Sequence, residues 1–266
     1  MRRSRITLVS AVLLALAPSG EPAARAATLP DPSVTGTVLF NLGGRQDLAA
    51  FGSIELTDAR FGSVHADVSG TPSPSIVASA HIGPNAVTQS LYGRGTGALT
   101  YYFEIEGPSG SVPVSIDVAG AATGVATAGA SFAVESRWSL YASIALTTVL
   151  AGDDIASGQQ SGSFDQGFDH TVSLMLATNH TYPVLLVADA QAAATDAGSD
   201  SLADAFVDPI FSFGPGVDPL AYSFHFSDGI GNTTVPEPAA LSLLGTGCMA
   251  LGVVGRRRGH RKGMRS

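Results

Sequence analysis

The sequence predicts an all-β, sandwich-like exported domain between an N-terminal signal peptide and a C-terminal single transmembrane sorting helix. Three observations lead to this prediction. Short stretches of alternating apolar and polar residues fill the middle of the chain. Turns rich in Gly and Pro separate these stretches, and each end carries an uncharged apolar run beside a cluster of arginines. We therefore divide the 266 residues into three parts, 1–26, 27–234 and 235–262.

The first part has the layout of a secretory signal peptide. A cationic start leads into the apolar stretch Ile6–Ala17, and a polar stretch then ends in Ala24-Arg25-Ala26. A membrane-spanning helix is the alternative. However, twelve residues rise only about 18 Å, which is less than the about 30 Å of the hydrocarbon core. We therefore predict export through the inner membrane, with cleavage of the signal at the Ala24/Ala26 site.

The middle part is predicted to form strands. In Ser111–Val118 apolar and polar residues alternate, which is typical of a half-buried strand, and Pro113 indicates an edge position. Tyr101–Glu106 and Tyr222–Ser227 show the same alternation, with aromatic residues on one face. Many short strands with Gly-rich turns favour a β-sandwich. Two further strands are predicted at Thr171–Leu176 and Tyr182–Ala188.

Two stretches of the middle part do not show the pattern of a strand. Gly93–Thr100 has spaced glycines and is predicted to be a loop. The alanine-rich segment Ala190–Phe206 is the one helical candidate, although Gly198 and several Asp and Ser residues favour a loop there. No linker divides the middle part, so we expect one domain.

The charge of the middle part excludes nucleic acid as a partner. Four arginines face 20 acidic residues between Ala27 and Val235, a net charge of −16. Binding to nucleic acid depends on the neutralisation of phosphates by Lys and Arg. The single cysteine, Cys248, allows no disulfide within the chain, so the domain depends on its core or on bound ions for stability.

Calcium is the one cofactor that the sequence raises. Aspartates cluster in the middle part, and oxygen-rich loops of this kind bind Ca²⁺, which takes 6–8 oxygen ligands. The alternative is that Asp serves only as a solubilising turn residue. We favour this alternative because no loop has the spacing of an EF-hand. The candidate metal ligands are Asp153, Asp154, Asp204 and Asp208.

Catalytic motifs are absent from the sequence. It contains no H-E-x-x-H, C-x-x-C, G-x-S-x-G or P-loop pattern. The histidines of the middle part are scattered, and a lone histidine on a strand is more often a structural residue than a catalyst. We therefore predict that the protein is not an enzyme.

The C-terminal part predicts a membrane segment. The uncharged run Ala239–Val254 begins after Pro238, which is a favourable residue at a helix start. The arginines that follow would act as a stop-transfer signal and stay in the cytoplasm. A buried core helix is the alternative, but such a helix would carry a polar stripe that this run lacks. The stop-transfer residues are Arg256, Arg257 and Arg258.

Three features of the C-terminal part together resemble a PEP-CTERM sorting signal. They are Val235-Pro236-Glu237-Pro238, the "LLGTG" of the apolar run and the arginine cluster. The resemblance implies that an exosortase, an integral-membrane protease and transpeptidase of Gram-negative bacteria, recognises Pro236, Glu237 and Pro238 and cuts near them. The protein would then be anchored transiently in the membrane and afterwards reach the cell surface or the medium. Parts of the middle region also resemble the ectodomain common among such proteins, which implies a β-sandwich of unknown activity.

Three functions are compatible with this organisation. We prefer a non-enzymatic surface or matrix protein associated with exopolysaccharide in a biofilm. The alternative is a Ca²⁺-dependent carbohydrate-binding or adhesion module that uses Tyr92, Trp138 and Tyr141, although we favour Trp138 as a core residue of the sandwich. A hydrolase with a pair of carboxylates is the third hypothesis.

Overall fold

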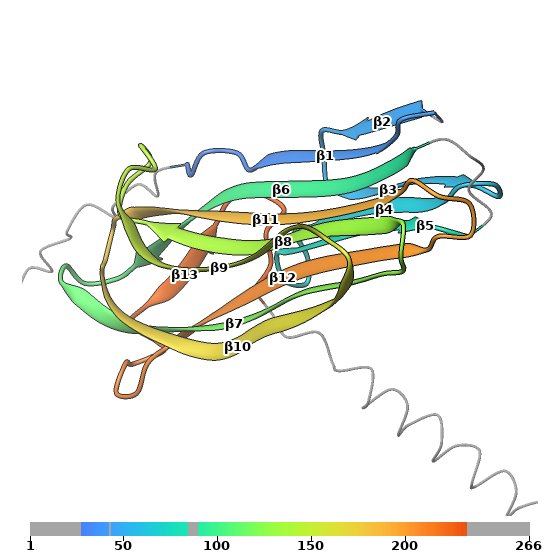
Figure 1. Ribbon diagram of the computed structural model, residues 1–266. Coiled ribbons are helices and arrows are strands. Elements are labelled where there is room, and N and C mark those ends of the chain that lie inside the picture. Colours follow the sequence, from blue (N-terminus) through green and yellow to red (C-terminus); the bar gives the residue numbers. More distant parts are fainter. Residues whose placement is uncertain (1–27, 43, 85–89, 233–266) are drawn as a thin grey trace, which may run out of the picture.

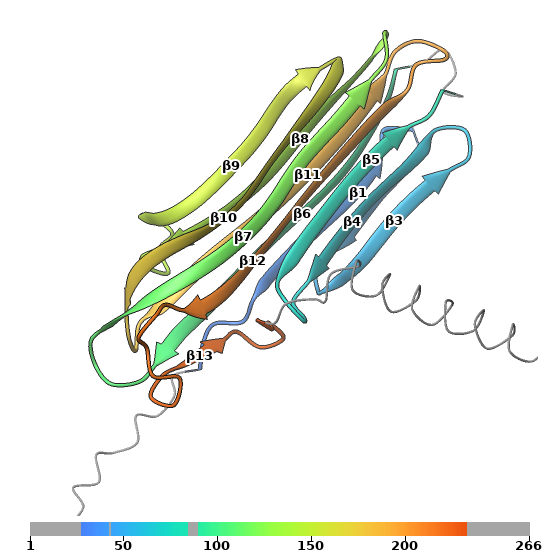
Figure 2. The same cartoon turned by 90° about the horizontal axis from the view of Figure 1, so that it is seen from below.

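The computed structural model describes residues 28–42, 44–84 and 90–232. Within these residues every regular element is a β-strand, and the strands form two antiparallel sheets that pack face to face (Figure 1). The view from below shows the elongated strands of one layer in front of those of the other (Figure 2). The predicted all-β sandwich is thus confirmed. The predicted signal peptide and transmembrane sorting helix lie outside the described residues.

The first sheet, called sheet A, has the strand order β2-β1-β6-β11-β8-β9. The short last strand β13 pairs with the end of β6, beyond the part that β1 covers. The strands of sheet A are β1 Ser33–Phe40, β2 Gly44–Leu48, β6 Leu91–Glu106, β8 Ala130–Tyr141, β9 Val149–Gln160, β11 Thr181–Ala194 and β13 Ser223–Phe226.

The second sheet, sheet B, has the order β10-β7-β12-β5-β4-β3. Its strands are β3 Gly52–Asp58, β4 Gly62–Ser69, β5 Ser75–Ile82, β7 Ser111–Ala126, β10 Gly162–Ala177 and β12 Ser201–Phe213. The four predicted strands within 101–188 and the one at 222–227 therefore all exist, and most of them are longer than the alternating pattern indicated.

The core lies between the two sheets and is built by the alternation of side chains along each strand. Tyr101, Phe103 and Ile105 of β6 are fully buried, as the alternation predicted. Trp138 of β8 is also fully buried, which confirms its interpretation as a core residue. The other large side chains that are fully buried are Phe132, Ile76, Ile82, Leu91, Leu99, Ile116, Leu140 and Leu186.

The prediction of a loop at Gly93–Thr100 was wrong, because this stretch is the first half of β6. Its glycines lie on the inner face, where the two sheets approach closely. A Cβ atom at Gly95 would collide with the backbone carbonyl oxygens of His65 and Ser79 in sheet B. The glycines are therefore required by the distance between the sheets rather than by a turn.

The Ala190–Phe206 segment is neither a helix nor a continuous loop. β11 continues to Ala194, β12 begins at Ser201, and Gly198 lies in the turn between them with a φ of 85°. The alanines of β11 are buried at alternate positions on the inner face. Pairing with β6 and β8 on both sides thus overrides the helical propensity of alanine.

β7 is not an edge strand, although Pro113 predicted one. It pairs with β10 on one side and β12 on the other. β12 ends at Phe213, opposite Val114 of β7. Pro113 is tolerated because its missing N–H would face the point where β12 leaves the sheet, so no hydrogen bond between the strands is lost. The carbonyl of Pro113 still accepts a hydrogen bond from the amide of Gly214 (2.9 Å).

Candidate functional site

The candidate functional site is the end of the sandwich from which the predicted sorting segment leaves the domain. β13 pairs with the last residues of β6, from Phe103 to Glu106. After this strand, the backbone amide of Ser227 donates to the carbonyl of Tyr102 (2.9 Å), and its hydroxyl donates to the carbonyl of Pro30 (2.8 Å). The beginning and the end of the described chain therefore meet at this end, which we call the β13 end.

The last described residue, Asn232, is fixed to sheet B by its side chain. Its Oδ1 accepts a hydrogen bond from the backbone amide of Phe211 (2.8 Å), and its Nδ2 donates to the carbonyl of Phe211 (2.7 Å). The side-chain amide thus replaces a neighbouring strand at this point of β12. The predicted recognition residue Pro236 follows only four positions later in the sequence.

An aromatic cluster holds β13 against the core. The rings of Phe213 and Phe224 are stacked, with centroids 4.2 Å apart and planes 12° apart. Phe103 and Phe211 join the two sheets behind them, with centroids 4.7 Å apart. Burial of such rings contributes several kcal/mol in total, so β13 is a firmly attached part of the domain.

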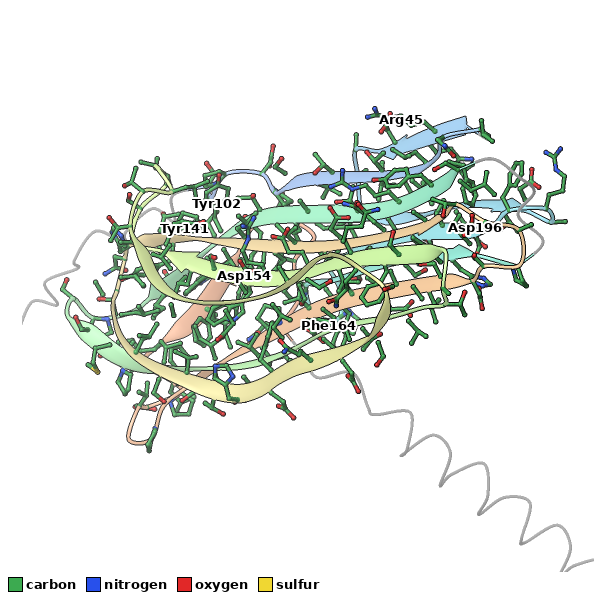
Figure 3. All side chains as sticks on the ribbon, in the orientation of Figure 1. Arg45, Tyr102, Tyr141, Asp154, Phe164 and Asp196 are labelled. Atoms are coloured by element: carbon green, nitrogen blue, oxygen red, sulfur yellow. The ribbon has the colours of Figure 1, made fainter. Side chains whose placement is uncertain are left out.

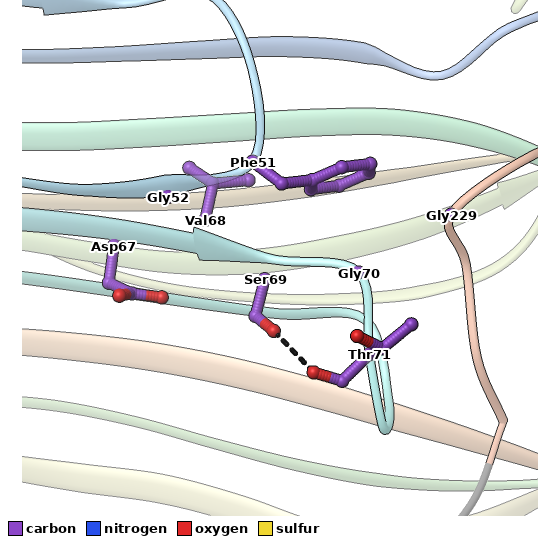
Figure 4. Close-up of a pocket in the computed structure, with 8 residues that line it drawn as sticks. All are labelled: Phe51, Gly52, Asp67, Val68, Ser69, Gly70, Thr71 and Gly229. Atoms are coloured by element: carbon purple, nitrogen blue, oxygen red, sulfur yellow. Dashed lines mark hydrogen bonds between the residues drawn. The ribbon is translucent and has the colours of Figure 1, made fainter.

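A shallow pocket of about 410 Å³ lies beside this exit (Figure 4). Its lining includes Phe51, Asp67 and Gly229, and within it the hydroxyl of Ser69 donates to the carbonyl of Thr71 (2.8 Å). Asp67 is the one charged residue in the lining. The pocket therefore offers one carboxylate and one aromatic ring next to the segment that leads to Asn232.

Asp153 and Asp154, two of the predicted metal ligands, lie on opposite faces of β9. Asp153 faces inward, where its Oδ2 accepts a hydrogen bond from Nε1 of Trp138 (2.7 Å) and lies 3.3 Å from Nε2 of His170. Asp154 lies on the outer face, opposite Arg137 in the strand register. The structure therefore does not bring the two carboxylates together, and Asp153 serves as the partner of a buried indole.

Asp204 and Asp208, the other two candidates, lie on the outer face of β12. Burial raises the pKa of both carboxyl groups above the usual value of 3.8. Oδ2 of Asp208 accepts a hydrogen bond from Ser73 (3.3 Å), whereas its Oδ1 has no hydrogen-bond partner among the described residues. Among those residues, no group of three or more His, Cys, Asp or Glu side chains is arranged to hold a metal ion.

The histidines do not form the arrangement of a hydrolase in the part of the chain that the structure describes. His225 comes closest, because its Nε2 lies 3.2 Å from the hydroxyl of Ser223 and 2.6 Å from a carboxylate oxygen of Glu106. In a catalytic triad the acid and the nucleophile contact different ring nitrogens. Here both contact Nε2, which differs from the arrangement of a triad.

The predicted aromatic residues are placed on different surfaces. Tyr141 lies at the β13 end and Tyr92 at the other end of sheet A, and neither faces the core (Figure 3 labels Tyr141). Tyr92 lines a small recess with Gln159 and Gln191. The two rings therefore do not form one platform.

Sequence reasoning missed the residues that fix the exit of the chain. The bonds between Asn232 and Phe211 join residues 21 positions apart, and no local pattern indicates them. The predicted sorting residues Pro236, Glu237 and Pro238, the arginines 256–258 and the cleavage site at Ala24 and Ala26 lie outside the described residues. Within the described residues, no helix is long and apolar enough to cross a membrane.

Comparison with known protein families identifies the C-terminal segment. The family model of the PEP-CTERM protein-sorting motif matches residues 234–258. This confirms the resemblance seen in the sequence. No curated protein sequence matches the chain.

Comparison with solved structures gives only remote similarities. A structure of infectious bursal disease virus, Gt strain, is 11% identical, with a TM-score of 0.15, and covers 86% of this chain and 70% of the viral chain. A structure of the Gx strain is 10% identical, with a TM-score of 0.17, and covers 86% and 69%. Similarities at this level carry no argument about fold or function.

Proposed function

We propose that this chain, which carries a PEP-CTERM protein-sorting motif, is a non-enzymatic surface or matrix protein of a Gram-negative bacterium that associates with exopolysaccharide in a biofilm. The motif itself indicates sorting to the cell surface by an exosortase. In our proposal the signal peptide directs the chain through the inner membrane, and residues 239–254 anchor it there until an exosortase cuts near Pro236–Pro238.

The position of the motif relative to the folded domain supports this proposal. The domain is fixed as far as Asn232, and only three residues separate it from Pro236. Two prolines around Glu237 favour an extended backbone, which is the conformation that protease clefts bind. A folded domain followed at once by an extended motif, an apolar run and arginines is the arrangement expected of a protein delivered by its C-terminal segment.

The proposal is tested by replacing the acidic residue of the motif. We expect Glu237→Ala to leave full-length protein in the membrane fraction, because the recognition residue is lost. Glu55→Ala is the matched control, since Glu55 is an exposed residue of β3 far from the motif in sequence, and this variant should be released like the wild type. Normal release of the Glu237→Ala variant would contradict exosortase-dependent sorting.

A Ca²⁺-dependent carbohydrate-binding or adhesion module is the second candidate, and the outer face of sheet B favours it. Phe206 is 38% exposed there, directly between Val77 of β5 and Ala121 of β7. The adjoining row of the sheet carries polar side chains in register, which supply hydroxyl and carboxylate groups for a sugar: Asp165, Thr123, Asp204, Ser79 and His65. An exposed ring beside such groups is a suitable surface for a glycan.

The two candidates are separated by measuring binding of the purified protein to the producing cell's own polysaccharide, with Ca²⁺ present and then chelated. Saturable binding that is lost on chelation and in Phe206→Ala would support the carbohydrate-binding module. Binding that persists after chelation and in Phe206→Ala would favour the matrix protein. Absence of binding in both conditions would contradict the association with exopolysaccharide as well as the binding module. Val125→Ala, at another exposed apolar position of sheet B, is the matched control.

A further inference from the structure

The turn between β8 and β9 forms an uncharged apolar tip. We define the β8–β9 tip as residues Tyr141–Gly152, a stretch without any charged side chain. Ile144 is 64% exposed, Val149 54%, and Leu146 and Leu150 39% each. Four large apolar side chains exposed so close together in the sequence are unusual in a water-soluble surface and indicate a binding function.

The tip is held in one defined conformation. The amide of Ala142 donates to the carbonyl of Thr148 (2.8 Å), and the amide of Leu146 donates to the carbonyl of Ser143 (3.0 Å). Nε2 of His180 lies 2.8 Å from the carbonyl oxygen of Ala142 and links the tip to the next turn. The exposed side chains are therefore presented by an ordered turn.

Leu146 has a left-handed backbone conformation, with a φ of 53°. This conformation costs about 1 kcal/mol or more for a residue with a Cβ atom, whereas glycine adopts it freely. The tip thus places a leucine where glycine would be more favourable for folding, and this leucine stays partly exposed. The cost is understandable if the side chain has a partner outside the domain.

The β8–β9 tip lies at the β13 end, from which the sorting segment departs. Leu140, near the end of β8, lies opposite Val184 of β11. Two residues before Val184, Tyr182 of β11 lies opposite Phe103 of β6, which also pairs with β13. The end of β8 and the strand β13 therefore lie at the same end of sheet A. Figure 3 shows Tyr141 and Tyr102 at one end of the sandwich and Arg45 and Asp196 at the opposite end. Leu220, which is 95% exposed, lies in the connection before β13.

The length of chain after the domain brings a membrane within reach of this end. Six residues separate Asn232 from Ala239, where the apolar run begins. The seven steps from Asn232 to Ala239 span at most about 25 Å when fully extended. A chain anchored through residues 239–254 therefore keeps the β13 end close to the lipid surface.

We propose that the β8–β9 tip inserts its apolar side chains into the interface of a zwitterionic membrane while the sorting segment anchors the protein. This inference rests on the proposed function, because the anchor brings the membrane to the tip. The charge of the surroundings determines the type of lipid. The exposed acidic residues Asp31, Glu106, Asp218 and Asp228 lie at the same end and would be repelled by anionic headgroups.

The test uses the full-length protein reconstituted into phosphatidylcholine vesicles. A fluorophore is attached at Ile144→Cys in a Cys248→Ser background, and quenching by lipids brominated in their acyl chains is measured. Leu42→Cys is the matched control, because Leu42 is 51% exposed in the β1–β2 turn, beside Arg45 at the opposite end. We expect at least threefold stronger quenching at position 144 than at position 42, and weaker quenching at 144 when phosphatidylglycerol is added.

Flotation of the same vesicles separates failure of this inference from failure of the proposed function. Protein that floats with the vesicles but shows equal quenching at both positions would overturn the membrane contact of the tip and would leave the anchor intact. Protein that does not float would overturn the anchor, and with it the inference.

A second variant separates the role of the tip from folding. Leu146→Gly removes an apolar side chain and relieves the left-handed backbone, so it should unfold at the same or a higher urea concentration than the wild type. We expect it to reduce quenching at position 144 at least twofold. Unchanged quenching in this variant would show that Leu146 does not contact lipid and would contradict the proposal.

Discussion

The side-chain amide of Asn232 binds both the N–H and the carbonyl group of Phe211, and in this way it ends the folded domain on the edge of β12. The same device occurs at an exposed position, where Oδ1 of Asn41 accepts from the amide of Tyr92 (3.0 Å) and its Nδ2 donates to the carbonyl of Ser90 (2.9 Å). The two asparagines differ mainly in how accessible their backbone partners are to water.

This difference leads to a first prediction. Asn232→Ala leaves the two polar groups of the buried Phe211 without their partner, which should lower the free energy of unfolding by about 2 kcal/mol. Asn41→Ala should cost less than about 1 kcal/mol, because water replaces the amide at the exposed site. Urea unfolding of both variants measures the difference, and equal losses would contradict the role assigned to Asn232.

The second prediction concerns Asp153 and the buried indole of Trp138. Asp153→Ala leaves Nε1 of Trp138 unpaired in the core, and we expect a loss of about 1–3 kcal/mol in the free energy of unfolding. Trp138 is the only tryptophan, so its fluorescence reports the change directly. Asp154→Ala on the outer face of the same strand should leave both stability and the emission spectrum close to those of the wild type. A spectral shift of equal size in the two variants would argue against the hydrogen bond.

The third prediction is a pH dependence caused by Asp208. Burial raises the pKa of this carboxyl group in the folded state above its usual 3.8, while the hydrogen bond from Ser73 opposes the shift. The folded state therefore favours the protonated carboxyl group. The resulting contribution to the free energy of unfolding is fully present below pH 3.8 and is lost as the pH rises through the raised pKa. Asp208→Asn should be more stable than the wild type at pH 7, by less than about 1 kcal/mol because solvent screens this partly exposed group, and this advantage should disappear in acid.

Asp58 provides the control of opposite sign. Its ion pair with Arg60 lowers the pKa of the Asp58 carboxyl group to about 2, so its contribution is present above pH 3.8 and lost as the pH falls through about 2. Asp58→Asn should therefore be slightly less stable than the wild type at pH 7. Denaturation curves at several pH values measure both variants. A gain for Asp58→Asn, or a loss for Asp208→Asn, at neutral pH would refute the assignment.

The fourth prediction tests the close approach of the two sheets. Gly95→Ala would push a methyl group into the backbone carbonyls of His65 and Ser79, and we expect a loss of about 3 kcal/mol. At Gly158 in β9 a methyl group would meet no atom within 4 Å, so Gly158→Ala should be neutral or slightly stabilising. Thermal unfolding of the two variants provides the comparison, and a neutral Gly95→Ala would mean that the sheets separate easily.

The sequence predicted the sandwich because alternation along a strand is a local pattern. Val112, Val114 and Ile116 are buried as the pattern requires. The sorting motif is likewise local, because its residues are contiguous in the sequence. The errors at residues 93–100 and 190–206 share one cause. Glycine and alanine were judged by their local propensities, whereas here they are selected by the narrow space between the sheets, which involves partners far away in the sequence.

The candidate site was predictable only in part, for a related physical reason. Asp153 and Asp154 are neighbours in the sequence, but the two-residue period of a strand directs them to opposite faces. The contact between Asn232 and Phe211 depends on how the chain returns to β12 after β13. The uncharged stretch Tyr141–Gly152 was visible in the sequence, but only the structure shows that its apolar side chains are exposed.

The pairing of β13 with β6, and the bond from Ser227 to Pro30, have a consequence for the timing of export. A chain that crosses the membrane from its N-terminus can complete the β13 end only after residues 223–232 have emerged. The Pro-Glu-Pro motif emerges only a few residues later. Completion of the fold and arrival of the motif at the membrane therefore coincide. An exosortase would receive its substrate at the moment when the domain has completed its fold.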